Sequence, residues 1–161
     1  MLNKIRKNLK DKAGFTLVEL IVVLVILAIL AAMLVPALTG YIDKANKEKV
    51  TAECRQVVMA AQTEISTLYG KAQGGKLTQA DLDKTVDTKT LAQRIEALSE
   101  TKGKFAVTVS DDGVVKNVKY QNSNWVAEYV VGDNGGSYND PVKATVDNKV
   151  TTNSVGFPQA D

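Results

Sequence analysis

The stretch that decides the fold, residues 14–38, reads GFTLVELIVVLVILAILAAMLVPAL. No charged residue occurs between Leu20 and Ile42. A helix rises about 1.5 Å per residue, so about 20 apolar residues cross a hydrocarbon core about 30 Å thick. Phe15–Leu38 has 24 residues, and apolar side chains surround the predicted helix on all sides. The stretch therefore predicts a membrane-spanning helix.

A basic flank precedes this helix. Residues 1–14 contain five cations and one acid, namely Lys4, Arg6, Lys7, Lys10, Lys12 and Asp11. Positive charge on one side of a span predicts that the N-terminus stays in the cytoplasm. A secretory signal is one alternative, but its apolar core has only about 7–15 residues before a small-residue cleavage site. A plain membrane anchor is another, and it leaves Glu19 unexplained.

Glu19 is the unusual residue of the apolar segment, because it lies near its start between Val18 and Leu20. An ionisable group within a membrane span costs about 3 kcal/mol on insertion scales. Either its carboxylate extends to the lipid headgroups, or it pairs with a cation inside an apolar assembly. Nothing else in the span is positive. That cation would therefore come from another chain or from a newly made amino group.

The order of these features is that of a known signature. A short basic leader, Gly14-Phe15-Thr16-Leu17-Val18-Glu19 and an apolar helix together resemble the prepilin signature of type IV pilins and pseudopilins. The resemblance implies that a membrane peptidase cuts after Gly14 and N-methylates Phe15, so that residues 1–14 are a cleaved leader. It also implies that Glu19 neutralises the Phe15 amine of a neighbouring subunit in a homopolymer. An assembly platform and an ATPase would be further partners.

Pro36 and Gly40 predict a helix break at the end of the assembly helix, residues 15–40. Proline cannot donate a backbone hydrogen bond and crowds the preceding turn. Two interpretations stay open. The break is a kink where the helix leaves the bilayer, or, by the resemblance, a segment that melts and stretches within a filament.

Beyond this point, residues 41–70 predict an amphipathic second half of the helix that ends at Tyr69-Gly70. Its apolar residues fall at helical spacing: Val50, Cys54, Val57, Val58, Ala61, Ile65 and Leu68. Cys54 lies within this stripe, and we interpret it as a small buried residue rather than a reactive thiol.

Residues 71–161 predict a globular head that begins with a helical loop region. Thr78-Gln79-Ala80-Asp81 has the pattern of a capping box, and Leu91, Ile95 and Leu98 mark a second short helix. These features predict two short helices between the long helix and the rest of the head.

The apolar period then changes to two. It predicts antiparallel strands over 104–110, 114–121 and 125–131, with turns at 112–113 and 122–124. In the polar C-terminal tail, 142–146 and 149–152 predict one more hairpin around Asp147-Asn148. The predicted fold class is α+β, a long N-terminal helix whose C-terminal half packs on a small antiparallel sheet of three to five strands, as in type IV pilins.

The composition limits the kinds of catalytic group, disulfide and metal site that the chain can contain. The 161 residues include no histidine and one cysteine, which excludes Ser-His-Asp triads, Cys-His pairs and an internal disulfide. Turn formation accounts for the acidic and amide residues of the tail better than calcium, because no EF-hand spacing is present. We predict no enzyme activity and no catalytic, cofactor-binding or metal site. Without the leader, 15 basic and 17 acidic residues remain, a net charge of −2, which disfavours bulk nucleic-acid binding.

These observations favour a structural subunit of a type IV pilus filament for surface adhesion or motility. Two alternatives stay open, a pseudopilin of a type II secretion or competence DNA-uptake machine, and a membrane-tethered soluble domain of other function. The expected location is the bacterial cytoplasmic membrane as a single-pass precursor, and then an extracellular surface filament.

Overall fold

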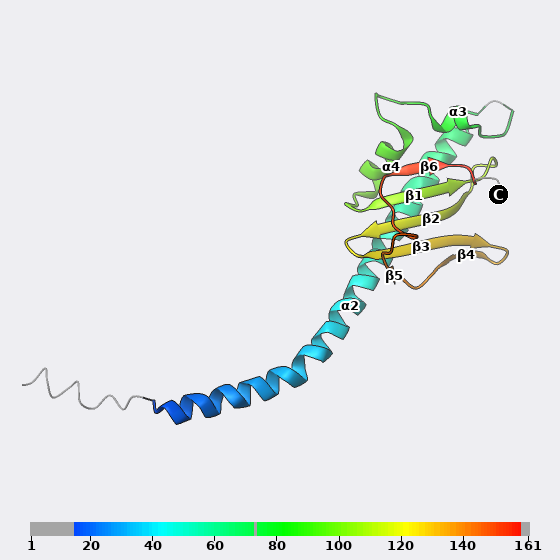
Figure 1. The fold of residues 1–161 in the computed structure, drawn as a ribbon. Helices are drawn as coiled ribbons and strands as arrows, with labels where there is room; N and C mark the ends of the chain where they lie inside the picture. Colours follow the sequence, from blue (N-terminus) through cyan, green and yellow to red (C-terminus); the bar gives the residue numbers. More distant parts are fainter. Residues whose placement is uncertain (1–14, 73, 159–161) are drawn as a thin grey trace, which may run out of the picture. The chain divides into compact units, whose positions relative to one another are not determined.

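The computed structural model describes residues 15–72 and 74–158 (Figure 1). The described chain divides after Ile42 into two compact units, an N-terminal helical unit and a head unit. Its elements in chain order are α2 (Leu17–Tyr69), α3 (Gln79–Leu82), α4 (Leu91–Ser99), β1 (Lys104–Val109), β2 (Val115–Asn122), β3 (Trp125–Gly132), β4 (Gly135–Tyr138), β5 (Val142–Lys143) and β6 (Ser154–Gly156).

The long helix α2 passes through Pro36 and Gly40 without interruption. The helical secondary structure is therefore not interrupted at these residues, and a kink there stays a prediction. A proline removes one backbone hydrogen bond, and the helix formers on both sides maintain the remaining ones. The Thr39 hydroxyl also donates to the Pro36 carbonyl at 2.9 Å. Melting of this segment inside a filament stays a prediction.

The second half of α2 is amphipathic, and it ends at Tyr69 as predicted. One face is buried in the head and comprises Val50, Cys54, Val57, Ala60, Ala61, Ile65 and Leu68. The burial of Cys54 confirms its interpretation as a member of the apolar stripe. Val58 lies at the edge of the stripe and is only half-buried.

The two short helices follow the sequence prediction. α3 begins with a capping box in which the Thr78 N–H and hydroxyl donate to Asp81 Oδ2 at 3.0 and 2.7 Å. α4 has a second capping box, between Thr90 and Gln93, which the sequence analysis did not identify. Leu91 and Ile95 of α4 are buried, whereas Leu98 is 51% exposed.

The sheet has the strand order β4-β3-β2-β1-β6, and β5 pairs with β3 beside β4 (Figure 1). β1, β2 and β3 form the predicted antiparallel meander, with strand ends within one residue of those expected. The two turns need left-handed backbone conformations, at Gly113 with φ of 81° and at Ser123 with φ of 54°. The α+β fold class is confirmed.

A β-bulge explains why the apolar residues of β2 do not alternate strictly. The register shifts between Thr108 and Val109, so that Val109 pairs with Val115 while Thr108 pairs with Asn117. Two residues of β2 thus oppose one residue of β1. As a result, Val115 and Val118 both reach the core although they are three residues apart.

The C-terminal third differs from its prediction. The hairpin expected from 142–146 and 149–152 does not form, since β5 pairs with β3 and β6 pairs in parallel with β1. The strand β4, which was not predicted, pairs with β3 around a two-residue turn at Asp133-Asn134. The described part of the head therefore has six strands and one parallel pair, rather than three to five antiparallel strands. Val146 cannot anchor a hairpin because it is 95% exposed.

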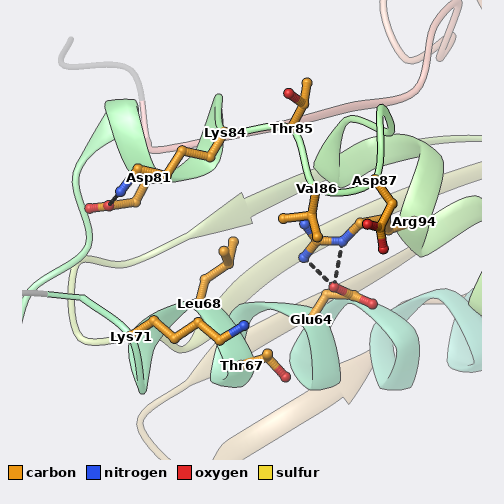
Figure 2. A pocket seen from close by; sticks show the side chains of 10 residues that line it. All are labelled: Glu64, Thr67, Leu68, Lys71, Asp81, Lys84, Thr85, Val86, Asp87 and Arg94. Carbon is orange, nitrogen blue, oxygen red and sulfur yellow. Dashed lines mark hydrogen bonds and ion pairs between the residues drawn. The ribbon is translucent and has the colours of Figure 1, made fainter.

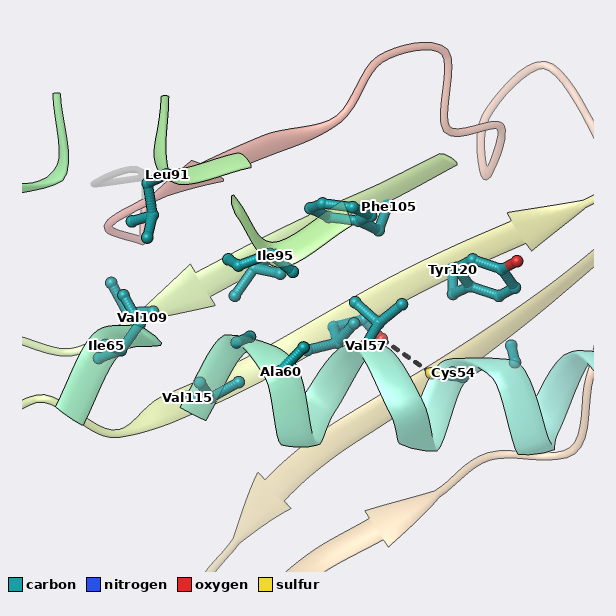
Figure 3. Close-up of a cluster of buried hydrophobic side chains, with 14 of the residues drawn as sticks. Cys54, Val57, Ala60, Ile65, Leu91, Ile95, Phe105, Val109, Val115 and Tyr120 are labelled. Carbon is teal, nitrogen blue, oxygen red and sulfur yellow. Dashed lines mark hydrogen bonds between the residues drawn. The ribbon is translucent and has the colours of Figure 1, made fainter. Parts of the chain in front are cut away.

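The core of the head lies between α2, α4 and one face of the sheet (Figure 3). Its largest fully buried side chains include Tyr120, Phe105, Ile65, Ile95 and Val57. Figure 3 shows Ile95 of α4 beside Phe105 of β1, with the apolar stripe of α2 opposite them. The packing of the second half of α2 on the sheet is therefore confirmed.

Candidate functional site

The N-terminal segment of α2 exposes an unusual amount of apolar surface. Every large apolar side chain from Phe15 to Ile42 is exposed by at least 50%, and Phe15 itself by 83%. Soluble proteins rarely leave a continuous apolar surface of this extent uncovered. The segment therefore needs lipid or protein around it.

One helix of the described chain, α2, is long and apolar enough to cross a membrane. Its most apolar 18-residue window has a mean hydropathy of 3.2 and no buried residue. This window lies near the N-terminus, as the apolar stretch of residues 14–38 predicts.

Glu19 occupies the first turn of α2 and caps it. The N–H and the hydroxyl of Thr16 each donate to Glu19 Oε2 at 2.8 Å, and the Glu19 N–H donates to Thr16 Oγ1 at 3.3 Å. This reciprocal arrangement is a capping box, which satisfies donors that the first turn of a helix leaves unpaired. In the single chain, the carboxylate is thus held by its own helix.

Thr16 is a site residue that the sequence analysis named only as part of the motif. The signal was present, because Thr16-Leu17-Val18-Glu19 is a capping-box pattern directly before an apolar run. The contact gives Glu19 a second role, in helix capping, beside the charge pairing expected from the resemblance.

The other predicted site residues lie apart from this cap. Gly14 lies outside the described residues, whereas Phe15 directly precedes the capping Thr16. Pro36 lies 17 residues beyond Glu19, about 25 Å along the helix. A Cβ atom added at Gly40 would meet no atom within 4 Å. Among the described site residues, Phe15 and Glu19 thus lie at the N-terminal end of α2, and Pro36 and Gly40 lie further along it.

A polar cluster on Glu53 fixes the head on α2. Glu53 Oε2 accepts from the Tyr120 hydroxyl at 3.1 Å and from Asn122 Nδ2 at 2.7 Å. The Tyr120 hydroxyl in turn accepts from the Gly103 N–H at 3.0 Å. Desolvation, together with the charge of Glu53, raises the pKa of Tyr120 to about 12. The cluster connects α2, β2 and the segment before β1 through one buried phenol.

Cys54 is the remaining group of chemical interest in the head. It is fully buried, and burial raises the pKa of its thiol to about 12. A thiol that stays protonated is a poor nucleophile and a poor metal ligand. The described residues contain no group of three or more Cys, Asp or Glu side chains that could hold a metal ion.

A comparison with protein families identifies the N-terminal segment. The prokaryotic N-terminal methylation motif matches residues 9–35. This motif is the signature of type IV pilins and prepilins, so the resemblance inferred from the residues is confirmed for this segment. It supports a pilin-like or pseudopilin family and a membrane-anchored precursor that a prepilin peptidase processes. No curated protein and no solved structure matches the chain.

Proposed function

We propose that this chain is the precursor of a structural subunit of a type IV pilus filament. The observation that carries the proposal is the apolar surface from Phe15 to Ile42, which begins within the methylation motif. Lipid covers this surface before assembly, and the same surface of neighbouring subunits covers it in a filament. The product is a homopolymer on the cell surface, used in adhesion or motility.

Processing comes first in this proposal. A prepilin peptidase cuts after Gly14 and methylates the new amine of Phe15. The cut removes the five cations of the leader. While these charges remain, they hold the segment at the cytoplasmic face, because moving them across a membrane is costly. An assembly platform and its ATPase then extract the mature subunit.

Assembly exchanges the partner of Glu19. In the single chain the carboxylate is bound by Thr16. In a filament, the Phe15 amine of a neighbouring subunit becomes its charged partner. Breaking such a buried pair by removing one charge costs about 3–5 kcal/mol. The cost recurs at each subunit contact, so the pair acts as a register check on polymerisation.

The capping box permits an experiment that separates the two roles of Glu19. Glu19→Gln keeps an acceptor for Thr16 but has no charge, whereas Thr16→Val keeps the charge but has no hydroxyl. We expect Glu19→Gln and Glu19→Val to abolish filaments, with mature subunit accumulating in the membrane. Thr16→Val should still polymerise. Glu48→Gln is the matched control, since it removes an exposed carboxylate from the head unit.

Filament yield after shearing, electron microscopy, subunit abundance and intact mass are the measurements. Normal filaments in Glu19→Val would remove the charge pair from the proposal. Loss of filaments in Thr16→Val alone would make capping the essential role. A mature N-terminus other than Phe15 would contradict the processing step.

The second candidate, a pseudopilin, shares the methylation motif and differs in the assembly that it forms. A pseudopilus is a short filament within a secretion or DNA-uptake machine. The sequence has one cysteine, so it cannot form the C-terminal disulfide loop that many pilins have. Long sheared filaments favour the pilin. Cells that lose protein secretion or DNA uptake without losing surface filaments favour the pseudopilin.

A further inference from the structure

A cavity of the head unit lies where β1 begins and β2 ends, next to the segment that leads to β6. It has a volume of about 360 Å³, and its walls come from three separate stretches of chain. These stretches place three lysines around one hollow, namely Lys102, Lys104 and Lys149. Among the described residues, no carboxylate lines this lysine cavity, so its lining has a formal charge of +3.

A second cavity of the head has a different charge balance (Figure 2). Its lining has three cations and three carboxylates, namely Lys71, Lys84, Arg94, Glu64, Asp81 and Asp87. Two of the cations already have partners, because Arg94 pairs with Glu64 and Lys84 pairs with Asp81. That lining is neutral and contains its own counter-charges, whereas the lining of the lysine cavity contains none.

The acid behind the wall of the lysine cavity is already paired. Asn122 Nδ2, in the lining, donates to Glu53 Oε2 at 2.7 Å, and the Tyr120 hydroxyl donates to the same oxygen. The other oxygen of Glu53 lies 3.9 Å from Lys49 Nζ. The three lysines of the cavity have no ion pair with any described residue. An anion in the hollow would therefore be attracted by all three.

Hydrogen bonds and close packing fix the walls of the lysine cavity. Gln121 Oε1 accepts from the Val150 N–H at 2.8 Å, and Gln121 Nε2 donates to the Ser123 carbonyl at 3.3 Å. A Cβ atom added at Gly103 would overlap the Gln121 carbonyl oxygen, so the third stretch lies directly against β2. The three stretches are thus joined before any ligand arrives, which lowers the entropic cost of binding.

The lining favours a compact anion with more than one charge. An ammonium group acts as a point charge, and the lining has no arginine whose planar fork would match a carboxylate. The uncharged part of the surface is polar. The exposed Ser123 and Thr151 carry hydroxyls, whereas Val150, the apolar side chain of the lining, is buried. Hydroxyl groups next to the anionic group of a ligand would suit this surface.

We propose that the lysine cavity binds a phosphate group, either free or as the monoester of a small polyol. The three lysines neutralise the phosphate, and the hydroxyls of Ser123 and Thr151 contact the polyol of the ester. The cavity belongs to the head unit, so its occupancy does not depend on the proposed pilus function.

The test is a titration of the full-length chain in uncharged detergent micelles at low ionic strength, followed by the amide NMR resonances of Lys104, Ser123 and Thr151. The probes are glycerol phosphate and inorganic phosphate, at a pH of about 8, above the second phosphate pKa of about 6. Glycerol, sodium acetate and sodium chloride, the salts at matched ionic strength, are the comparisons. We expect saturable shifts with phosphate and none with the comparisons. Tighter binding of glycerol phosphate would identify the ester as the ligand, and equal or tighter binding of inorganic phosphate would identify the free ion.

Two matched lysine variants complete the test. Lys149→Met removes one exposed cation of the cavity and should weaken phosphate binding about fivefold, the loss of one exposed charge contact at low ionic strength. Lys71→Met removes an exposed lysine outside this cavity and should leave the affinity unchanged. Equal responses to acetate and phosphate would overturn the proposal. So would the absence of a saturable shift, or an unchanged affinity in Lys149→Met.

Discussion

Replacing Tyr120 with phenylalanine should destabilise the head without leaving a cavity. Tyr120 is fully buried, and its hydroxyl joins the Gly103 N–H to Glu53. Phenylalanine keeps the ring and removes only the hydroxyl. The perturbation therefore measures the polar cluster rather than hydrophobic packing.

The structure allows an approximate magnitude for Tyr120→Phe. The Gly103 N–H loses its acceptor in a buried position, which costs about 1–3 kcal/mol. Glu53 also loses a donor, but it keeps Asn122 and its side chain is 20% exposed, so water offsets part of this loss. The free energy of unfolding should fall by about 2–4 kcal/mol in total.

The assay uses Trp125, the single tryptophan, which is 8% exposed in the folded head. Its fluorescence follows urea unfolding of the full-length chain in micelles. Tyr129→Phe is the control, because the Tyr129 hydroxyl makes no hydrogen bond with the described residues, and we expect a change within about 0.5 kcal/mol. A loss below about 0.5 kcal/mol in Tyr120→Phe would refute the reasoning, since the Gly103 N–H would then have found another acceptor.

Three further outcomes are expected. The free energy of unfolding should fall as the pH rises from about 9 to about 12, because the unfolded chain releases the protons of Cys54 and Tyr120 that burial retains in the folded head. Cys54→Ala should reduce this pH dependence in urea unfolding, and an unchanged slope would exclude the thiol. Gly113→Ala should destabilise the head by about 1–3 kcal/mol, because φ is 81° and the new Cβ would lie 2.8 Å from Tyr69 Cγ, whereas Gly40→Ala meets open space and should not. The mature subunit, with a net charge of −2, should bind DNA weakly in a gel-shift assay, and tight salt-sensitive binding would contradict this.

Sequence reasoning predicted the fold where side-chain periodicity was strong. The alternation of Phe105, Val107 and Val109 identified β1, and the apolar stripe of α2 identified the face that packs on the sheet. The predicted boundaries of the strands β1, β2 and β3 were accurate because glycine and asparagine residues mark the turns between them. The continuity of α2 through Pro36 was not predicted, since one missing hydrogen bond signals a break but does not require one.

The C-terminal strands could not be predicted for a different reason. β4 begins with Gly135-Gly136, which have no side chains to show alternation. β6 has three residues, and its pairing with β1 depends on a contact that local sequence does not encode. In the N-terminal segment, the motif identified Phe15 and Glu19. The capping-box pattern from Thr16 to Glu19 is present in the sequence as well, but its hydrogen bonds were recognised only in the structure. The ion pair between Glu64 of α2 and Arg94 of α4 joins residues 30 positions apart, so no local sequence pattern predicts it.

The parallel pairing of β6 has a consequence for the order in which the head is made. β1 pairs with β6 through residues 106–108 and 154–156. A ribosome synthesises β1 before β6, so one edge of β1 has no partner strand until residues 154–156 have been translated. An open strand edge is a template for pairing with other chains. A fragment terminated before residue 154 should therefore aggregate during biosynthesis, because it lacks the strand that covers this edge of β1.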